Sequence, residues 1–198
     1  MNSAPTVGVL ALQGAVSEHS DIMTSLGART VLVRRADQID GLAGIIIPGG
    51  ESTAMARIAA PLGLFPVLRE RVIAGLPVLG TCAGLILLAD RVTDAGALNG
   101  FDRLATLDIT AQRNAYGNQL ASFEAPVTMP EHDHATIDAA FIRAPVISEV
   151  GPAARVIAEH GNTPVAVQQD HQIAATFHPE ITGDTTLHQM LYRLISGA

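Results

Sequence analysis

The feature that most constrains the fold of this chain is the alternation, in its first half, of short apolar segments with amphipathic ones. Apolar segments typical of buried strands occur at 7–12, 30–34, 44–50 and 77–81. Helical spacing of apolar residues occurs at 15–26, 53–75 and 83–92. Prolines at 61 and 66 are expected to interrupt the second of these helices. Because strands that are apolar on both faces must be covered on both faces, this order predicts a parallel sheet between two layers of helices.

The second half of the chain consists mainly of short β-rich segments separated by turn signals. These segments lie at 105–110, 120–129, 139–145, 155–160, 164–169 and 173–180. We expect them to extend the sheet, partly as antiparallel strands, and a last helix to follow at 184–195. No repeat, linker or low-complexity segment divides the sequence, and 198 residues suffice for one core. We therefore predict a single three-layer α/β/α domain over 1–198, with a mixed, mostly parallel sheet and a short tail at 1–6.

Composition argues against several classes of function. Twelve basic and 19 acidic residues give a net charge of −7, and the basic residues form no cluster, so nucleic-acid binding is not expected. The apolar runs are too short to span a membrane, and no positively charged region precedes the first of them, so we expect neither a membrane span nor a signal peptide. A single cysteine cannot form an internal disulfide, which fits a reducing compartment and predicts a cytoplasmic protein.

The single cysteine, Cys82, lies where a predicted buried strand turns directly into a predicted helix. Glycines stand two residues before and two residues after it, in the sequence GTCAG (80–84). This pattern is typical of a nucleophile elbow, a tight turn in which bulky neighbours at those positions would clash. The thiol would then stand at the carboxyl end of the sheet, where open α/β folds bind ligands. A buried structural cysteine is the alternative.

His178 is the histidine best placed to act as a base for this thiol. It ends an apolar segment in the sequence FHPE, and Glu180 follows two residues later. Because residues two apart on an extended segment point the same way, the Glu180 carboxylate can hold one ring nitrogen while the other faces the thiol. The sequence therefore predicts a nucleophile, a base and an orienting acid. A surface His-Pro-Glu sequence at a strand end is the alternative.

The remaining histidines are given no catalytic role. Structural or exposed positions are expected for His19, His160, His171 and His188. His132 and His134 form an H-x-H pair in the polar loop PEHDH, but no further ligand cluster accompanies them. We therefore expect neither a metal site nor a cofactor.

A third segment, IIIPGGEST (45–53), ends a predicted buried strand in Pro-Gly-Gly and begins a helix near Ser52. Backbone N–H groups exposed by such a turn can bind an oxyanion or a carboxylate. An ordinary glycine turn with Ser52 or Thr53 as the helix N-cap is the alternative, and the two roles are compatible.

Together these segments resemble the class I, triad-type glutamine amidotransferases, which have a three-layer, flavodoxin-like fold. Within that class the chain resembles the family of glutaminase subunits of pyridoxal 5′-phosphate synthases. The narrower resemblance rests on stretches that follow one another over almost the whole chain: GVLALQGAVSEH (8–19), IIPGGEST (46–53), GTCAGLILLA (80–89), RNAYGNQLASFE (113–124), FIRAP (141–145) and FHPE (177–180).

The resemblance implies a reaction and a set of site residues. Cys82 would attack the side-chain amide of L-glutamine to form a γ-glutamyl thioester, His178 would protonate the leaving ammonia, and Glu180 would hold His178. The backbone N–H groups of Gly50 and Ala83 would form the oxyanion hole. Glutamine contacts are implied for Gly50, Glu51, Ser52, Arg113, Ile142 and Arg143. From the residues alone, surface salt bridges would be the expected role of the two arginines.

The same resemblance implies a partner. In the family, ammonia passes through a tunnel to a separate (β/α)8-barrel synthase subunit, which condenses it with ribose 5-phosphate and glyceraldehyde 3-phosphate, and docking activates the glutaminase. Ala115 and Tyr116 stand where Ser and Phe are common, and the loop at 129–138 matches the family poorly. Asp170 stands where the family has glycine in a turn, and Asp tolerates left-handed turn geometry better than most residues.

Three other functions fit parts of the sequence. The nearest is a glutaminase subunit that serves another synthase, such as that of histidine biosynthesis. An α/β-hydrolase or a cysteine peptidase-like enzyme is the second, but Glu180 follows His178 instead of lying between the nucleophile and the histidine. A scaffold without enzymatic activity is the third.

Overall fold

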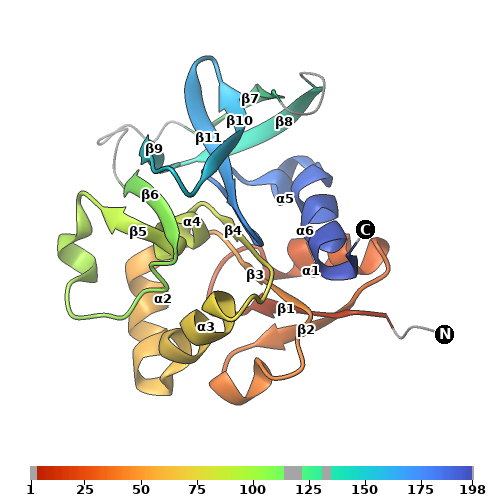
Figure 1. Cartoon of the computed structure of the whole chain (residues 1–198), viewed down its shortest axis with the longest axis vertical. Helices are drawn as coiled ribbons and strands as arrows, with labels where there is room; N and C mark the ends of the chain where they lie inside the picture. The colour runs from red at the N-terminus through yellow and green to blue at the C-terminus, as the bar shows by residue number, and fades with distance from the viewer. Residues whose placement is uncertain (1–3, 114–121, 131–134, 198) are drawn as a thin grey trace.

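The computed structural model of the chain describes residues 4–113, 122–130 and 135–197. Within these residues, the larger sheet has nine strands in the order β2-β1-β3-β4-β12-β11-β10-β7-β8 (Figure 1). The strands of this sheet are β1 (Thr6–Leu10), β2 (Arg29–Val33), β3 (Gly44–Ile47), β4 (Val78–Thr81), β7 (Ser122–Met129), β8 (Ala135–Ile142), β10 (Arg155–His160), β11 (Thr163–Gln169) and β12 (Gln172–Ala175). The first three residues of the expected tail lie outside the described residues, and β1 begins at Thr6.

The sheet is parallel in one part and antiparallel in the other. Neighbouring strands run parallel from β2 through β1, β3 and β4 to β12. From β12 onward, β11, β10, β7 and β8 pair antiparallel. The mixed, partly antiparallel extension is therefore the one expected from the β-rich second half.

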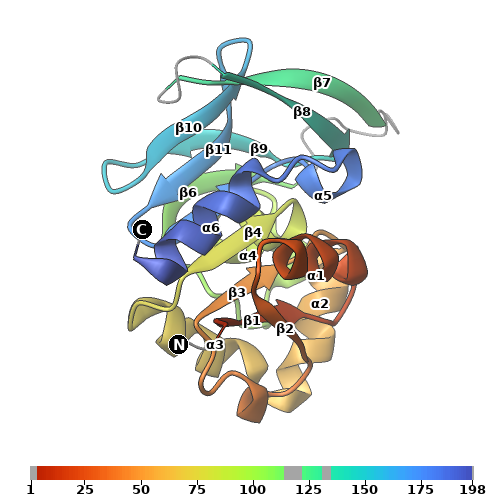
Figure 2. The same ribbon diagram turned by 90° about the vertical axis from the view of Figure 1, so that its right-hand side faces the viewer.

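Helices cover both faces of the parallel part (Figures 1 and 2). One layer contains α1 (Val16–Ser25), α5 (Pro179–Thr182) and α6 (Thr186–Ser196), and the other contains α2 (Ser52–Ala59), α3 (Leu64–Ile73) and α4 (Ala83–Leu88). The strand residues alternate accordingly, because Ile45 and Ile47 pack into one apolar cluster whereas Ile46 packs into the other. This confirms the three-layer α/β/α arrangement.

Two sequence-based predictions about secondary structure are wrong in this region. The helix expected over 83–92 ends at Leu88, and Ala89–Val92 form β5. This strand pairs with β6 (Leu107–Gln112), which also pairs with β9 (Val146–Val150), so the segment at 105–110 belongs to a separate three-stranded sheet. Pairing with a distant strand outweighs the local helical pattern here.

The helical segment at 53–75 is broken once, not twice. A short 3-10 turn at Ala60–Leu62 (η2) contains Pro61, and Gly63 follows with a positive φ of 56°. Pro66 lies in the first turn of α3, where a missing N–H removes no intrahelical bond. The expected interruption at Pro66 is therefore absent from this described segment.

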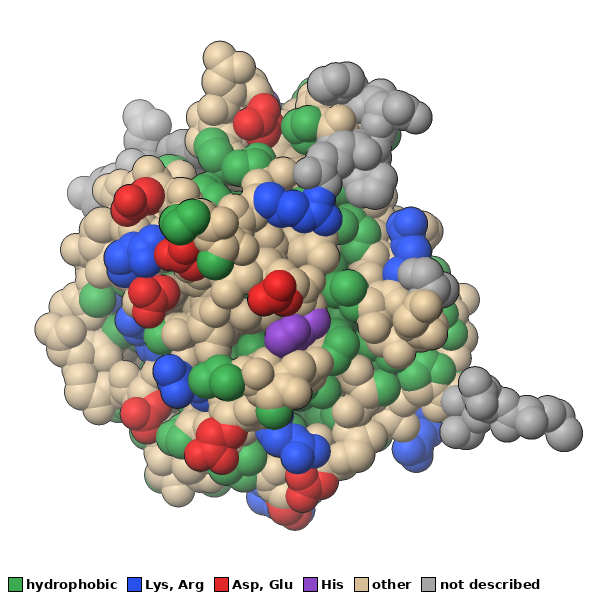
Figure 3. All heavy atoms as spheres, viewed as in Figure 1, with side chains coloured by type: hydrophobic (Ala, Val, Ile, Leu, Met, Phe, Trp, Pro, Cys, Tyr) green, Lys and Arg blue, Asp and Glu red, His purple; other side chains and the backbone are tan. Residues whose placement is uncertain are grey.

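Charged side chains are dispersed over the surface. On the face in Figure 3, the Arg side chains are spread out with acidic side chains between them. Exposed ion pairs such as Arg35–Asp37 belong to this pattern.

Asp170, in the turn between β11 and β12, has a positive φ of 49°, which confirms the left-handed geometry expected there. Among the described helices, none is long and apolar enough to cross a membrane.

Candidate active site

Cys82 occupies a strained turn between β4 and α4. Its φ of 49° and ψ of −102° are costly for a residue with a side chain and persist only where the surroundings impose them. The flanking glycines allow the turn by close approach: a Cβ on Gly84 would lie 2.1 Å from the Ile47 carbonyl oxygen, and one on Gly80 would lie 2.9 Å from the Gly84 carbonyl carbon. This is the strand-to-helix elbow that the sequence predicts.

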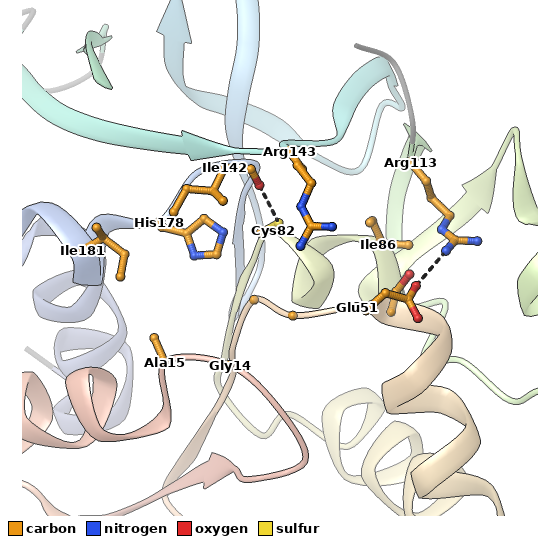
Figure 4. A pocket seen from close by; sticks show the side chains of 13 residues that line it. Gly14, Ala15, Glu51, Cys82, Ile86, Arg113, Ile142, Arg143, His178 and Ile181 are labelled. Carbon is orange, nitrogen blue, oxygen red and sulfur yellow. Dashed lines mark hydrogen bonds and ion pairs between the residues drawn. The ribbon is translucent and has the colours of Figure 1, made fainter. Parts of the chain in front are cut away.

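The Cys82 thiol borders a cavity of about 280 Å³ at the carboxyl end of the parallel strands (Figure 4). The residue is 6% exposed, and its sulfur lies 3.9 Å from the Ile142 carbonyl oxygen, which accepts a weak hydrogen bond. The cavity is lined by Gly14, Ala15, Gly49, Gly50, Glu51, Ser52, Cys82, Ile86, Arg113, Ile142, Arg143, His178 and Ile181. Every residue predicted to contact glutamine is therefore at this cavity, together with the thiol.

His178 lies beside Cys82 at the cavity, just before α5 (Figure 4). Its backbone N–H donates to the Ala140 carbonyl at 2.8 Å, and its Nδ1 lies 2.8 Å from Glu180 Oε1. The predicted pair is present, but the predicted reason is wrong. Pro179 and Glu180 begin a short helix instead of continuing an extended segment, and the turn brings the carboxylate to the ring.

The surroundings of His178 favour its charged form. Burial by itself would lower its pKa, but hydrogen bonds and charge interactions with Cys82 and Glu180 outweigh burial and raise the pKa of His178 to about 10. The Glu180 side chain is fully buried, so its interaction with the ring is little screened by water. These interactions favour the imidazolium form of the ring, which lies between the Cys82 sulfur and the Glu180 carboxylate.

Glu51 and Arg113 form an ion pair at the cavity (Figure 4). Glu51 is the N-cap of α2, because its carboxylate accepts from the backbone N–H groups of Thr53 and Ala54 at 3.0 and 2.7 Å. Partial burial opposes its ionisation, but these two bonds and Arg113 hold the pKa of Glu51 below its usual value. Arg113 Nη2 donates to Glu51 Oε1 at 3.1 Å and to Thr53 Oγ1 at 2.8 Å. Neither Ser52 nor Thr53 is the N-cap.

The other predicted contacts come from separate elements. Ser52 is the first residue of α2 and is 3% exposed. Arg143 follows β8 with a positive φ of 47°, and its side chain extends into the cavity (Figure 4). Gly50 lines the cavity, and Ala83 is buried as the first residue of α4. The N–H group of Ala83 therefore belongs to the first turn of the helix, where backbone donors have no intrahelical partner.

Some residues at the cavity were not singled out from the sequence. Gly14 and Ala15 lie in the GVLALQGAVSEH stretch, and Ile86 and Ile181 follow Cys82 and His178 by four and three residues. Their closeness in sequence to the quoted motifs was the only feature from which a place at the cavity could have been predicted.

Within the described ranges, no group of three or more His, Cys, Asp or Glu side chains is arranged to hold a metal ion. The candidate positions His132, His134, Ala115 and Tyr116 lie outside the described residues.

Comparison with known proteins places the chain in a family. The family model described as "SNO glutamine amidotransferase family" matches residues 9–196. The chain is 44% identical to a pyridoxal 5′-phosphate synthase subunit PdxT of Streptomyces griseus, over 98% of either chain. It is 48% identical to the PdxT of Kineococcus radiotolerans, over 94% of this chain and 92% of the relative.

Solved structures agree with this result. A crystal structure of a glutamine amidotransferase superposes with a TM-score of 0.87 at 39% identity, covering 96% of this chain and 98% of the other. PurLQS from Thermotoga maritima superposes with a TM-score of 0.69 over 98% of each chain, but at 13% identity it shows the fold alone. With 188 residues inside the family model and relatives matched over nearly their whole length, the chain belongs to the SNO glutamine amidotransferase family.

Proposed function

We propose that this chain hydrolyses L-glutamine to L-glutamate and ammonia and supplies the ammonia to a synthase subunit that makes pyridoxal 5′-phosphate. The observation that carries the proposal is the cavity that brings together a strained cysteine and a histidine held by a buried carboxylate. The family and the names of the relatives, each a subunit of pyridoxal 5′-phosphate synthase, support the same function.

The chemistry requires Cys82, His178 and Glu180 in distinct roles. The Cys82 thiolate attacks the carbonyl carbon of the glutamine side-chain amide, and the carbonyl electrons move to oxygen. When the carbonyl re-forms, the C–N bond breaks, and the His178 imidazolium gives its proton to the leaving nitrogen, which departs as ammonia. Water then attacks the thioester, neutral His178 takes its proton, and glutamate and the thiolate are released. Glu180 stays ionised and holds Nδ1–H throughout.

Charge stabilisation and substrate binding fall to the residues around the thiol. The N–H groups of Gly50 and Ala83 donate to the oxyanion of the tetrahedral intermediates. L-glutamine is a zwitterion, so its binding needs a cation for the α-carboxylate and an acceptor for the α-ammonium. Arg113 and Arg143 supply the cations, and the ionised Glu51 supplies an acceptor. Ser52 and the backbone of Ile142 complete the contacts with the substrate.

The partner in this proposal is the barrel subunit of the synthase, and docking to it directs ammonia away from water. The cytoplasm is the proposed location, because a catalytic thiol and a chain with one cysteine suit a reducing compartment. No cofactor is assigned to this chain.

Cys82→Ala tests the function in the complex with the barrel subunit. We expect this variant to lose glutamine-dependent formation of pyridoxal 5′-phosphate while synthesis from added ammonium salt continues at the wild-type rate. Unchanged synthesis from ammonium salt shows that the barrel subunit remains active in the complex with the variant. Persistent release of glutamate by Cys82→Ala would remove Cys82 from the mechanism. Stimulation of glutamine hydrolysis by the synthase of histidine biosynthesis, and not by the pyridoxal 5′-phosphate synthase, would favour the alternative partner.

A further inference from the structure

Behind the triad, the second oxygen of the Glu180 carboxylate faces a histidine. The Glu180 side chain has no exposed surface, and its Oε1 is taken by His178. Its Oε2 accepts no hydrogen bond within the part of the chain that the structure describes, and Nε2 of His19 lies 3.5 Å from it. A buried carboxylate oxygen without a donor is costly, so His19 is the group in position to satisfy it.

His19 is in turn bonded to a second buried histidine. Nδ1 of His19, on α1, lies 2.8 Å from Nε2 of His188, on α6, and both side chains are completely buried. Thr81, the residue before the nucleophile, places its hydroxyl oxygen 3.4 Å from Nε2 of His19. Two helices and the nucleophile strand therefore converge on one imidazole.

The contacts select one tautomer for each ring. If His188 donates from Nε2, His19 accepts at Nδ1 and carries its own proton on Nε2, facing Glu180 Oε2. The opposite arrangement would set a bare His19 nitrogen against the carboxylate and leave the proton on His188 Nδ1 without an acceptor among the described residues. A buried donor without an acceptor is rarer and costlier than an acceptor without a donor. The first arrangement is therefore favoured.

Both rings are neutral under working conditions. Burial lowers the pKa of His19 to about 4 against the opposing pull of Glu180, with His188 and His178 adding to the lowering. Burial also lowers the pKa of His188 to about 4. A neutral donor fixes the direction of the carboxylate without cancelling its charge, so the full negative charge faces the His178 imidazolium.

We propose that His19 and His188 are positioning residues for the reaction: His188 fixes the tautomer of His19, and the His19 Nε2–H holds Glu180 in the orientation that aims His178 at Cys82. This inference rests on the proposed function and adds two residues to it. Neither histidine contacts the substrate cavity, so both act through Glu180.

The test compares His19→Leu, which removes the donor, with His19→Gln, whose amide nitrogen can occupy the place of Nε2. The matched control is His171→Leu, which removes a 2.7 Å histidine bond to the Val72 carbonyl at a site away from the cavity. Glutamate release is measured in the complex with the barrel subunit, and ring-nitrogen NMR of the full-length wild-type chain reports the tautomers. We expect kcat to fall about 10- to 100-fold in His19→Leu with KM unchanged, and His19→Gln to recover most of it.

The outcomes separate the inference from the function it rests on. Equal kcat in His19→Leu and His171→Leu, or no recovery in His19→Gln, would overturn the positioning role while leaving glutamine hydrolysis intact. A wild-type complex that releases no glutamate would overturn the proposed function instead. If His19→Leu does not fold, the tautomers decide: protons on Nε2 of both rings support the inference, and a proton on Nδ1 of His19 refutes it.

Discussion

Gly49→Ala should displace the catalytic histidine while leaving every reacting group chemically unchanged. A Cβ at this glycine would lie 2.2 Å from Cε1 of His178, and 3.0 and 3.1 Å from its two ring nitrogens. Ordinary van der Waals contact begins at about 3.4 Å, so the ring or the Gly49 backbone must move by more than 1 Å. Glu180 is fully buried and cannot follow the ring freely.

The expected cost follows from that displacement. A shift of about 1 Å in a catalytic group lowers the rate roughly 100-fold, so we expect at least that loss in kcat for glutamine hydrolysis by the complex. Weakening a hydrogen bond to a charged group costs about 1.5–3 kcal/mol, and this sets the scale of the loss in unfolding free energy. The assay is glutamate release at saturating glutamine, with urea unfolding of the same preparations.

Gly96→Ala is the matched control, because a Cβ there meets no atom within 4 Å. It should keep both activity and stability. The reasoning would be refuted if Gly49→Ala released glutamate within about threefold of Gly96→Ala while the Nδ1–H resonance of His178 kept its wild-type position.

Three further predictions concern stability and protonation. In Gly84→Ala the new Cβ would clash with the Ile47 carbonyl oxygen, so the unfolding free energy measured by urea denaturation should fall by about 3 kcal/mol. A loss below about 0.5 kcal/mol would contradict the elbow geometry. Glu180→Gln should bring the pKa of His178 well below 10 by ring-nitrogen NMR, since a charge that raises it is gone, and an unchanged value would exclude the carboxylate as a cause. Folding lowers the pKa of His19 and His188 from 6.5 to about 4, so the contribution of these two rings to stability should be full above pH 6.5 and fall toward pH 4, by about 1.4 kcal/mol per pH unit for each ring. A urea midpoint that stays flat between pH 6.5 and pH 4 would mean that the rings are not buried as neutral groups.

The parallel half of the sheet was predictable because its strands are buried on both faces and therefore read as unbroken apolar runs. The run at Ile45–Ile47 needs only local information to be recognised. The residues Ala89–Val92 were mispredicted as helix because their strand exists only through pairing with β6, about twenty residues away. Such a partner leaves no trace in the local periodicity of the segment.

The site shows the same division between local and non-local information. Cys82 and His178 stand out because glycine and proline beside them mark unusual backbone. His19 ends the GVLALQGAVSEH stretch, but the local pattern predicts no role for it, because a histidine four residues before Met23 is an ordinary member of a helix face. Its proposed role depends on where α6 and Glu180 lie in the folded structure, and the spacing of residues in the sequence does not predict this.

The choice of histidine at position 19 has a physical reason. An arginine or lysine there would satisfy Glu180 Oε2 equally well, but its positive charge would compete with His178 for the carboxylate. The result would be a lower pKa for the catalytic ring and a weaker hold on the imidazolium that faces Cys82. A histidine kept neutral by burial supplies the donor without the charge. The neutral His19 leaves the negative charge of Glu180 to act on the catalytic ring, and the interactions of that ring with Cys82 and Glu180 together outweigh burial and favour its imidazolium form.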